Sequence, residues 1–448
     1  MKIIIKCLLG LLLVSCSHSG KETAQPTWLE ADSAAAIQSR LESDFSLTFD
    51  SAARLVRETH PELSDSDIMD MISKKYMEAK TINGELRVHR KSPRNLNLLC
   101  PSYNGGVKAR GENASEARIS YVDSVIAWYK GSNDKGLAHR VKYRFTIDVP
   151  FHEALEGDTI RTWMPLPLES DRQSDIVIVG TEPSDYITSS PENSVHNTIF
   201  FEKAVENGKA THFECTVEFT TRGSYFSPQF IRENIKDYDR ESELYKKYTS
   251  TELPHIIRLD SLAKEIVGDS TDPYECSEKV YDYIIKRYPW AGAREYSTIS
   301  CIPDYVVREG HGDCGQVALL YISLMRSLGI PARWESGWML HPGEKNLHDW
   351  AEVYFEGVGW VPVDVSFGRY VNSGDQAIEK FYSTGMDAHR LASNKGVCGT
   401  LYPPKRFVRS ETVDFQVGEV ETNKGNLFYP AWDSHLELIS VTPLKIEK

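Results

Sequence analysis

The residue best placed for nucleophilic chemistry is Cys314, in the stretch GHGDCGQVALLYISLMRSLGIPAR (residues 310–333). Asp313 is a typical helix N-cap, so we expect Cys314 in the first turn of a helix. Unpaired backbone N–H groups and the helix dipole at that point favour a thiolate and lower the pKa of a cysteine. Glycines at 310, 312 and 315 leave the sulfur sterically open. The pattern therefore suggests a reactive thiol, with a buried structural cysteine as the alternative.

A thiol nucleophile needs a base and a group that orients the base. The stretch HDWAEVYFEGVGWVPVD (residues 348–364) reads as a β-hairpin in which His348 begins the first strand and Asp364 ends the second. A tight turn at 357–358 would pair Asp364 with Ala351, which leaves an offset of three residues from His348, roughly 10 Å of strand. A bulge, twist or wider turn has to close this gap. Asp349 and Glu352 are the alternative orienting groups.

These two stretches, in this order, resemble the transglutaminase-like superfamily, whose core is shared with papain-like cysteine peptidases. The family pattern is a Gly-x-Cys helix ending in Gly-Ile-Pro-Ala-Arg, then His-x-Trp-x-Glu-Val, then Gly-Trp-x-x-x-Asp, and all three parts are present. The strong match covers about 305–368. The resemblance implies Cys314 as nucleophile, His348 as base and Asp364 as the orienting carboxylate.

Further residues are candidates for the walls of the cleft. The resemblance implies an aromatic oxyanion donor in the segment RYPW, where Tyr288 and Trp290 could serve through O–H or indole N–H; both could instead be core aromatics. The remaining cleft candidates are His311, Gly312, Trp338 and Trp350. The Cys and His residues of this region have no recognised zinc-ligand spacing, so we predict no metal and no cofactor.

The predicted reaction is cleavage of an amide bond in a peptide or protein substrate through a thioester on Cys314. Hydrolysis is favoured because a site open to the cell envelope has abundant water. The alternatives are a cross-linking protein-glutamine acyltransferase and an inactive binding or scaffold protein.

The fold class expected is α+β with several domains. Residues 139–149 alternate between apolar and polar, and similar runs up to residue 221 are typical of an immunoglobulin-like β-sandwich. Residues 317–328 are almost entirely apolar, which predicts a helix buried in a core. The expected divisions are a signal peptide (1–15), a tether (16–27), a helical region (28–117), a β-sandwich (118–230), a transglutaminase-like catalytic domain (231–395) and a C-terminal β portion (396–448).

The N-terminus indicates export. Two lysines precede an apolar run, and residues 13–16 (LVSC) resemble a bacterial lipobox, which implies lipidation of Cys16 and a protein anchored to the membrane in the bacterial cell envelope, periplasmic or surface-facing. The chain has a net charge of −13 and no run of basic residues with interleaved aromatics, so no nucleic-acid partner is expected. Cys215 and Cys276 fit core positions, and the pairing of Cys100, Cys301 and Cys398 is left open.

Overall fold

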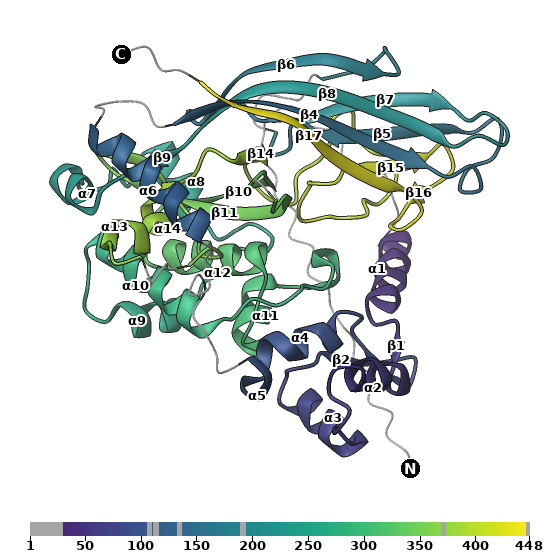
Figure 1. Cartoon of the computed structure of the whole chain (residues 1–448), viewed down its shortest axis with the longest axis horizontal. Coiled ribbons are helices and arrows are strands. Elements are labelled where there is room, and N and C mark those ends of the chain that lie inside the picture. The colour runs from purple at the N-terminus through teal and green to yellow at the C-terminus, as the bar shows by residue number, and fades with distance from the viewer. Residues whose placement is uncertain are drawn as a thin grey trace.

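A computed structural model describes residues 30–104, 110, 116–131, 137–188, 194–341, 343–368 and 373–444. The predicted signal peptide, the tether and Cys16 lie outside these residues. Figure 1 shows three parts: N-terminal helices at the lower right, a mixed helix and sheet unit at the left, and a β-sandwich along the top. Within the described ranges, no helix is both long and apolar enough to cross a membrane.

The N-terminal part contains five helices and a small antiparallel sheet of order β1-β3-β2. The sequence predicted helices alone, but the Asn83-Gly84 pair, with positive φ at both residues, turns β2 into β3 as a hairpin. The elements are α1 (Glu30–Asp44), β1 (Leu47–Thr48), α2 (Phe49–Arg57), α3 (Asp65–Ser73), β2 (Ala79–Ile82), β3 (Glu85–Val88), α4 (Ser92–Leu99) and α5 (Pro101–Asn104).

The mixed unit packs helices against a four-stranded antiparallel sheet of order β12-β11-β10-β14. Its centre is α12 (Cys314–Ser327), in which every residue from Gly315 to Arg326 is buried, as the apolar run predicted. The surrounding helices are α7 (Pro228–Asn234), α8 (Glu243–Thr249), α9 (Asp260–Val267), α10 (Pro273–Arg287) and α11 (Ile302–Glu309). The strands are β10 (Ala332–Met339), β11 (Asn346–Phe355), β12 (Gly359–Val363) and β14 (Arg390–Asn394).

The sandwich consists of two four-stranded antiparallel sheets, β17-β4-β8-β6 and β16-β15-β5-β7, which share one hydrophobic core. The strand β4 buries alternate residues, as its sequence predicted. The strands are β4 (Ala138–Val149), β5 (Thr159–Pro165), β6 (Gln173–Glu182), β7 (Thr198–Ala204), β8 (Thr211–Arg222), β15 (Glu419–Thr422), β16 (Asn426–Leu427) and β17 (Asp433–Pro443). The likeness of this sandwich to immunoglobulin domains stays a prediction.

The strand pairing departs from the predicted boundaries. The residues expected as a separate C-terminal β portion add strands to both sheets, since β17 pairs with β4 and β15 pairs with β5. Without them β4 and β5 would be unpaired sheet edges, which proteins avoid. The helix α6 (Glu116–Gly131), expected within the sandwich range, packs in a core with Trp350 and with Phe381 of the short helix α14 (Phe381–Thr384).

Gly337 lies where two strands of the mixed sheet approach each other too closely for a side chain. The register of β10 against β14 shifts between Ser336 and Gly337, and a Cβ at 337 would lie 2.0 Å from the carbonyl oxygen of Leu391. We expect Gly337→Ala to lower the free energy of unfolding by about 3 kcal/mol, since the strands must separate to admit the methyl group. Urea unfolding of the two proteins measures this.

The matched control is Gly425→Ala, between β15 and β16, where a Cβ would meet no atom within 4 Å. That variant should change the free energy of unfolding by less than about 0.5 kcal/mol. Equal losses in the two variants would contradict the close approach at Gly337.

Candidate active site

Cys314 is the first residue of α12, and its neighbours fix the start of that helix. The Asp313 side chain accepts a hydrogen bond from the backbone N–H of Gln316, and the Gln316 side chain accepts one from the backbone N–H of Asp313. This capping box holds the first turn in place. The Tyr296 hydroxyl donates to Oδ1 of Asp313 at 2.6 Å, which anchors the cap to the preceding loop.

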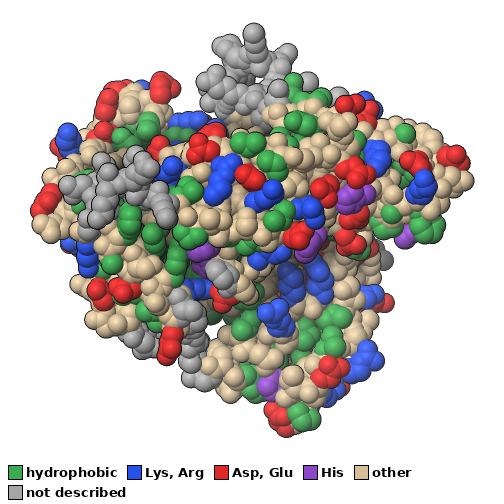
Figure 2. Space-filling view, turned by 45° about the horizontal axis from the view of Figure 1, so that its top comes forward, with side chains coloured by type: hydrophobic (Ala, Val, Ile, Leu, Met, Phe, Trp, Pro, Cys, Tyr) green, Lys and Arg blue, Asp and Glu red, His purple; other side chains and the backbone are tan. Residues whose placement is uncertain are grey.

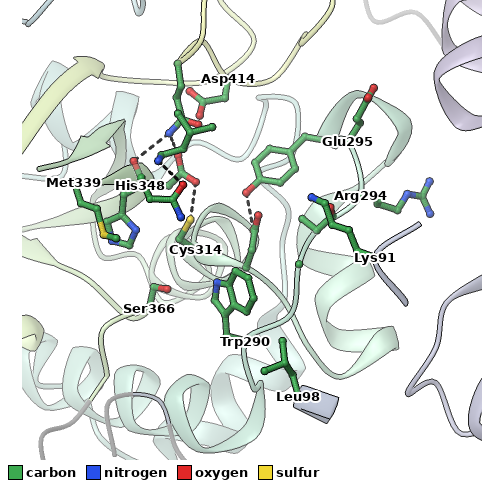
Figure 3. Close-up of a pocket in the computed structure, with 18 of the residues that line it drawn as sticks. Lys91, Leu98, Trp290, Arg294, Glu295, Cys314, Met339, His348, Ser366 and Asp414 are labelled. Carbon is green, nitrogen blue, oxygen red and sulfur yellow. Dashed lines mark hydrogen bonds between the residues drawn. The ribbon is translucent and has the colours of Figure 1, made fainter. Parts of the chain in front are cut away.

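The thiol of Cys314 faces a cavity of about 860 Å³ that also borders His348, Trp290 and Ser366. Figure 3 shows Cys314 near the centre of this cavity, with His348 beside Met339 and with Trp290 on another wall. Residues of α4 and residues 411–429 complete the wall, so the cavity is formed by segments from the N-terminal part, the mixed unit and the C-terminus.

His348 and Asp364 are brought together by the register of the β11–β12 hairpin. Phe355 pairs with Gly359, so the turn takes three residues, and Ala351 pairs with Val363 rather than with Asp364. Asp364 is one position past the end of β12, so it lies opposite Trp350. Trp350 and His348 are two residues apart on β11, so Asp364 lies on the same face of the sheet as His348 and diagonally across from it. Nε2 of His348 lies 2.7 Å from Oδ2 of Asp364. The wider turn thus closes the gap that the sequence left open.

The carboxylate of Asp364 is held at both oxygens. The backbone N–H groups of Ser366 and Phe367 donate to Oδ1 at 3.0 and 3.3 Å. The guanidinium of Arg390 forms an ion pair with Oδ2 at 3.1 Å and also pairs with Asp387 at 2.8 Å. Both side chains of the Arg390–Asp364 pair are buried, so Asp364 is a fixed, charged partner for the imidazole.

The hydrogen-bond partner of the thiol is Asp349, not His348. Sγ of Cys314 donates to Oδ2 of Asp349 at 3.2 Å, and the Gln416 amide donates to Oδ1 at 2.7 Å. Among the hydrogen bonds of the described residues, none joins Cys314 to His348. Asp349 points to α12 because it lies on the face of β11 opposite to His348. It does not orient the histidine, and Glu352 pairs instead with Arg333 and Arg172.

The segment that holds these residues matches a known family. The sequence model of the transglutaminase-like superfamily covers residues 260–365, which include Cys314, His348 and Asp364. Residues 260–365 form a transglutaminase-like domain.

Other proteins resemble the chain more distantly. An uncharacterized protein of Haemophilus influenzae is 23% identical over 339 residues, 65% of this chain and 89% of that protein. A protein named as a candidate cysteine protease from Cytophaga hutchinsonii is 16% identical over 70% of this chain and 92% of its own, with a TM-score of 0.46. The periplasmic domain of TgpA from Pseudomonas aeruginosa is 15% identical over 61% and 96%, with a TM-score of 0.27. At these identities the chemistry of the site has to be inferred from its own geometry.

The charge state of the nucleophile in the transglutaminase-like domain differs from the sequence expectation. Burial, together with the nearby Asp349 and Asp313 carboxyl groups, raises the pKa of the Cys314 thiol well above its usual range. The helix N-terminus was expected to lower that pKa, but desolvation of a thiolate outweighs the dipole here. At neutral pH Cys314 therefore rests as a thiol, and a nucleophilic attack by its sulfur would need a base.

His348 and Asp364 have charge states suited to accepting the proton of the thiol. Burial lowers the pKa of His348 below its usual value, even though the Asp364 carboxylate opposes this shift. Burial would raise the pKa of Asp364, but its interaction with His348, which includes a hydrogen bond, and the charge of Arg390 outweigh burial, and the pKa is lowered. A neutral imidazole next to an ionised carboxylate is the state of a general base.

The remaining residues predicted for the cleft divide into two groups. Trp290 lines the cavity and is 39% exposed, whereas Tyr288 is buried behind the wall against Tyr283. Four others lie outside the cavity wall. His311 packs against Tyr305, Gly312 is hydrogen-bonded to Pro289, Trp338 packs in the sandwich core, and Trp350 donates to Glu335.

Three residues of the site were missed from the sequence: Arg390, Asp414 and Gln416. They belong to no motif and lie more than 40 residues past the start of the hairpin, so only the tertiary fold brings them to Asp364 and Asp349. No group of three or more His, Cys, Asp or Glu side chains within the described ranges could hold a metal ion. The six described cysteines are all free.

Proposed function

We propose that the protein is a cysteine-dependent amide hydrolase acting on peptides. The observation that supports this most is His348, which lies on the wall of the cavity that the Cys314 thiol faces and is hydrogen-bonded to Asp364 at 2.7 Å. The proposed nucleophile and base thus border one cavity, and the orienting carboxylate of Asp364 lies buried behind the base. This combination is what thioester chemistry requires.

In the proposed reaction, the sulfur of Cys314 attacks the carbonyl carbon of the amide while its proton passes to His348. The tetrahedral oxyanion is stabilised by the backbone N–H of Cys314, which has no intrahelical acceptor at the first position of α12, and by the Trp290 indole. The C–N bond then breaks, and His348 returns the proton to the leaving amine. Water attacks the thioester, which releases the acid and regenerates the thiol.

Acyl transfer to an amine is the second candidate reaction, because an amine can replace water in the last step. A peptide substrate offered together with a primary amine, with products identified by mass spectrometry, distinguishes the two. Our proposal requires the free acid to form faster than the amine adduct. A faster amine adduct makes the protein an acyltransferase, and the absence of both products makes it a binding or scaffold protein.

We further propose that the protein is exported and anchored to a membrane of the bacterial envelope through lipid on Cys16. The motif LVSC at residues 13–16 after an apolar run supports this proposal. Expression of the full chain with a labelled fatty acid tests it. The wild type should carry label and sediment with membranes, and Cys16→Ala should do neither. Label retained in Cys16→Ala would contradict lipidation at this residue.

The pH dependence of hydrolysis follows from the state of His348. The base must be neutral to take the thiol proton, so activity is lost as the pH falls through the pKa of His348. Because burial lowers that pKa from 6.5, we expect the acid limb of kcat/KM to have its midpoint below pH 6.5. A pH–rate profile measures this, and a midpoint at or above 6.5 would contradict the neutral-base assignment.

A further inference from the structure

The wall of the active cavity is rich in cations although the whole chain is acidic. The chain carries a net charge of −13. Figure 2 shows Lys and Arg side chains gathered in a hollow near the centre of the visible face. The basic residues of the cavity wall are Arg90, Lys91, Arg94, Arg110, Arg118 and Arg294. Such a local excess of positive charge attracts anionic ligands.

Three of these cations form no ion pair with a carboxylate among the described residues: Lys91, Arg94 and Arg110. The other three pair with Asp44, Glu344 and Glu78. Lys91 precedes α4 and is half-buried, and among the described residues its Nζ donates to the carbonyl of Ala293 at 2.6 Å and to no other group. Arg94, one helical turn further, is exposed and has no hydrogen bond in the described structure.

Arg110 is the most deeply placed of the three and is buried. Its Nε donates to the carbonyl of Tyr288 at 2.8 Å, Nη1 donates to the Ser366 hydroxyl at 3.2 Å, and Nη2 donates to the carbonyl of Gly312. Gly312 is two residues before the nucleophile, so the guanidinium lies beside the reacting centre. A guanidinium has five N–H donors, which leaves two for a ligand. The three hydrogen-bond partners of Arg110 are neutral, and the carboxyl groups of Asp313 and Asp364 interact with its charge without a direct ion pair among the described residues.

The carboxyl groups of the wall offset this positive charge less than their number suggests. Burial raises the pKa of all five of them, and for Glu295 and Glu411 the pKa is raised to about 7. Burial lowers the pKa of Arg110 only to about 10, so it stays charged at neutral pH. The cavity is therefore more positive than its composition suggests.

We infer that the cavity takes an acidic peptide, whose carboxylate groups next to the scissile amide are bound by Lys91, Arg94 and Arg110. This inference rests on the proposed function for the reaction, and it adds the substrate class. A guanidinium binds a carboxylate through two parallel hydrogen bonds, which suits the free donors of Arg110. A flexible peptide can enter a cavity of about 860 Å³, whereas a membrane surface or a nucleic-acid duplex cannot reach a buried side chain.

Binding is measured on the full chain carrying Cys314→Ala, so that the result does not depend on turnover. The probes are two dye-labelled peptides, Ala-Glu-Ala-Ala-Glu-Ala and its counterpart with glutamine at both glutamates, followed by fluorescence anisotropy. The acidic peptide should bind about tenfold more tightly than the glutamine peptide, and high salt should remove the difference.

Matched charge reversals locate the effect. Arg94→Glu should weaken binding of the acidic peptide about tenfold. Arg54→Glu, an equal charge change at an exposed arginine of α2 that does not line the cavity, should leave that affinity within about twofold. Arg110→Met should also weaken it, and circular dichroism checks that this variant folds. If the Arg110→Met protein does not fold, the affinity of the Arg94→Glu protein for the acidic peptide tests the inference by itself.

Equal affinity for the two peptides, equal losses in Arg94→Glu and Arg54→Glu, or no binding of the acidic peptide up to about 1 mM overturns the inference. If anionic vesicles or an oligonucleotide displace the acidic peptide as well as an unlabelled copy does, the inference is also wrong. If the wild type hydrolyses no peptide but the binding pattern holds, the proposed function fails while the anion-binding cavity stands.

Discussion

Replacing Cys314 by alanine is expected to lower kcat/KM for peptide hydrolysis by about 10⁴-fold or more, because no other group in the cavity can form the thioester. The sulfur is the only atom of the proposed mechanism that makes a covalent bond to substrate. Loss of a nucleophile removes that route and leaves only the contribution of substrate binding and the oxyanion donors. Steady-state hydrolysis and mass spectrometry of a trapped acyl-enzyme measure the effect.

The control for this variant is Cys301→Ala, which removes a half-buried free thiol just before α11 and should retain activity. Alkylation gives an independent measurement that needs no substrate. Since burial raises the pKa of the Cys314 thiol well above its usual range, its reaction with iodoacetamide at pH 7 should depend on proton transfer to His348. An alkylation rate unchanged by His348→Ala would defeat the enzyme hypothesis.

Replacing Asp364 by asparagine is expected to lower kcat by about a thousandfold or more, with little change in KM. The ionised carboxylate accepts a hydrogen bond from Nε2 of His348 and so selects the tautomer whose other nitrogen can take a proton. An amide at this position can donate to Nε2 instead, which stabilises the wrong tautomer. The amide is also uncharged, so the imidazolium that forms on His348 during the reaction loses its anionic partner.

The matched control is Asp237→Asn, an exposed aspartate between α7 and α8, which should keep full activity. The Asp364→Asn protein should also unfold at lower denaturant, because Arg390 then loses one of its two buried carboxylate partners. Activity close to wild type in a folded Asp364→Asn protein would mean that His348 needs no orienting carboxylate. The proposed triad would then be wrong in its third member.

The cavity wall is built from segments that lie far apart in the chain. Lys91 comes from the N-terminal part, whereas Gln416, which holds Asp349, comes from the segment before β15. A fragment restricted to residues 231–395, the boundaries expected for the catalytic domain, lacks both. The transglutaminase-like domain therefore supplies the proposed nucleophile and base, and the rest of the chain supplies much of the cavity wall around them.

The sequence by itself determined the local features of the site. Asp313 with Gln316 specifies a helix start, and the apolar run after Cys314 specifies a buried helix, because caps and 3.6-residue periodicity are properties of neighbouring residues. The hairpin of His348 and Asp364 follows from alternating apolar residues around a glycine turn, and the strand β4 follows from the same alternation. These signals also carried the family resemblance.

The tertiary structure alone decided which side chains meet. One residue in the β11–β12 turn sets whether Asp364 shares a face with His348, because strand side chains alternate with a period of two. The pKa of Cys314 is raised by burial under distant segments and by the charge of Asp349, so this rise could not be read from the helix start. Arg390, Asp414 and the C-terminal strands reach the site or the sandwich through contacts between residues far apart in the chain, for which a single sequence has no local signal.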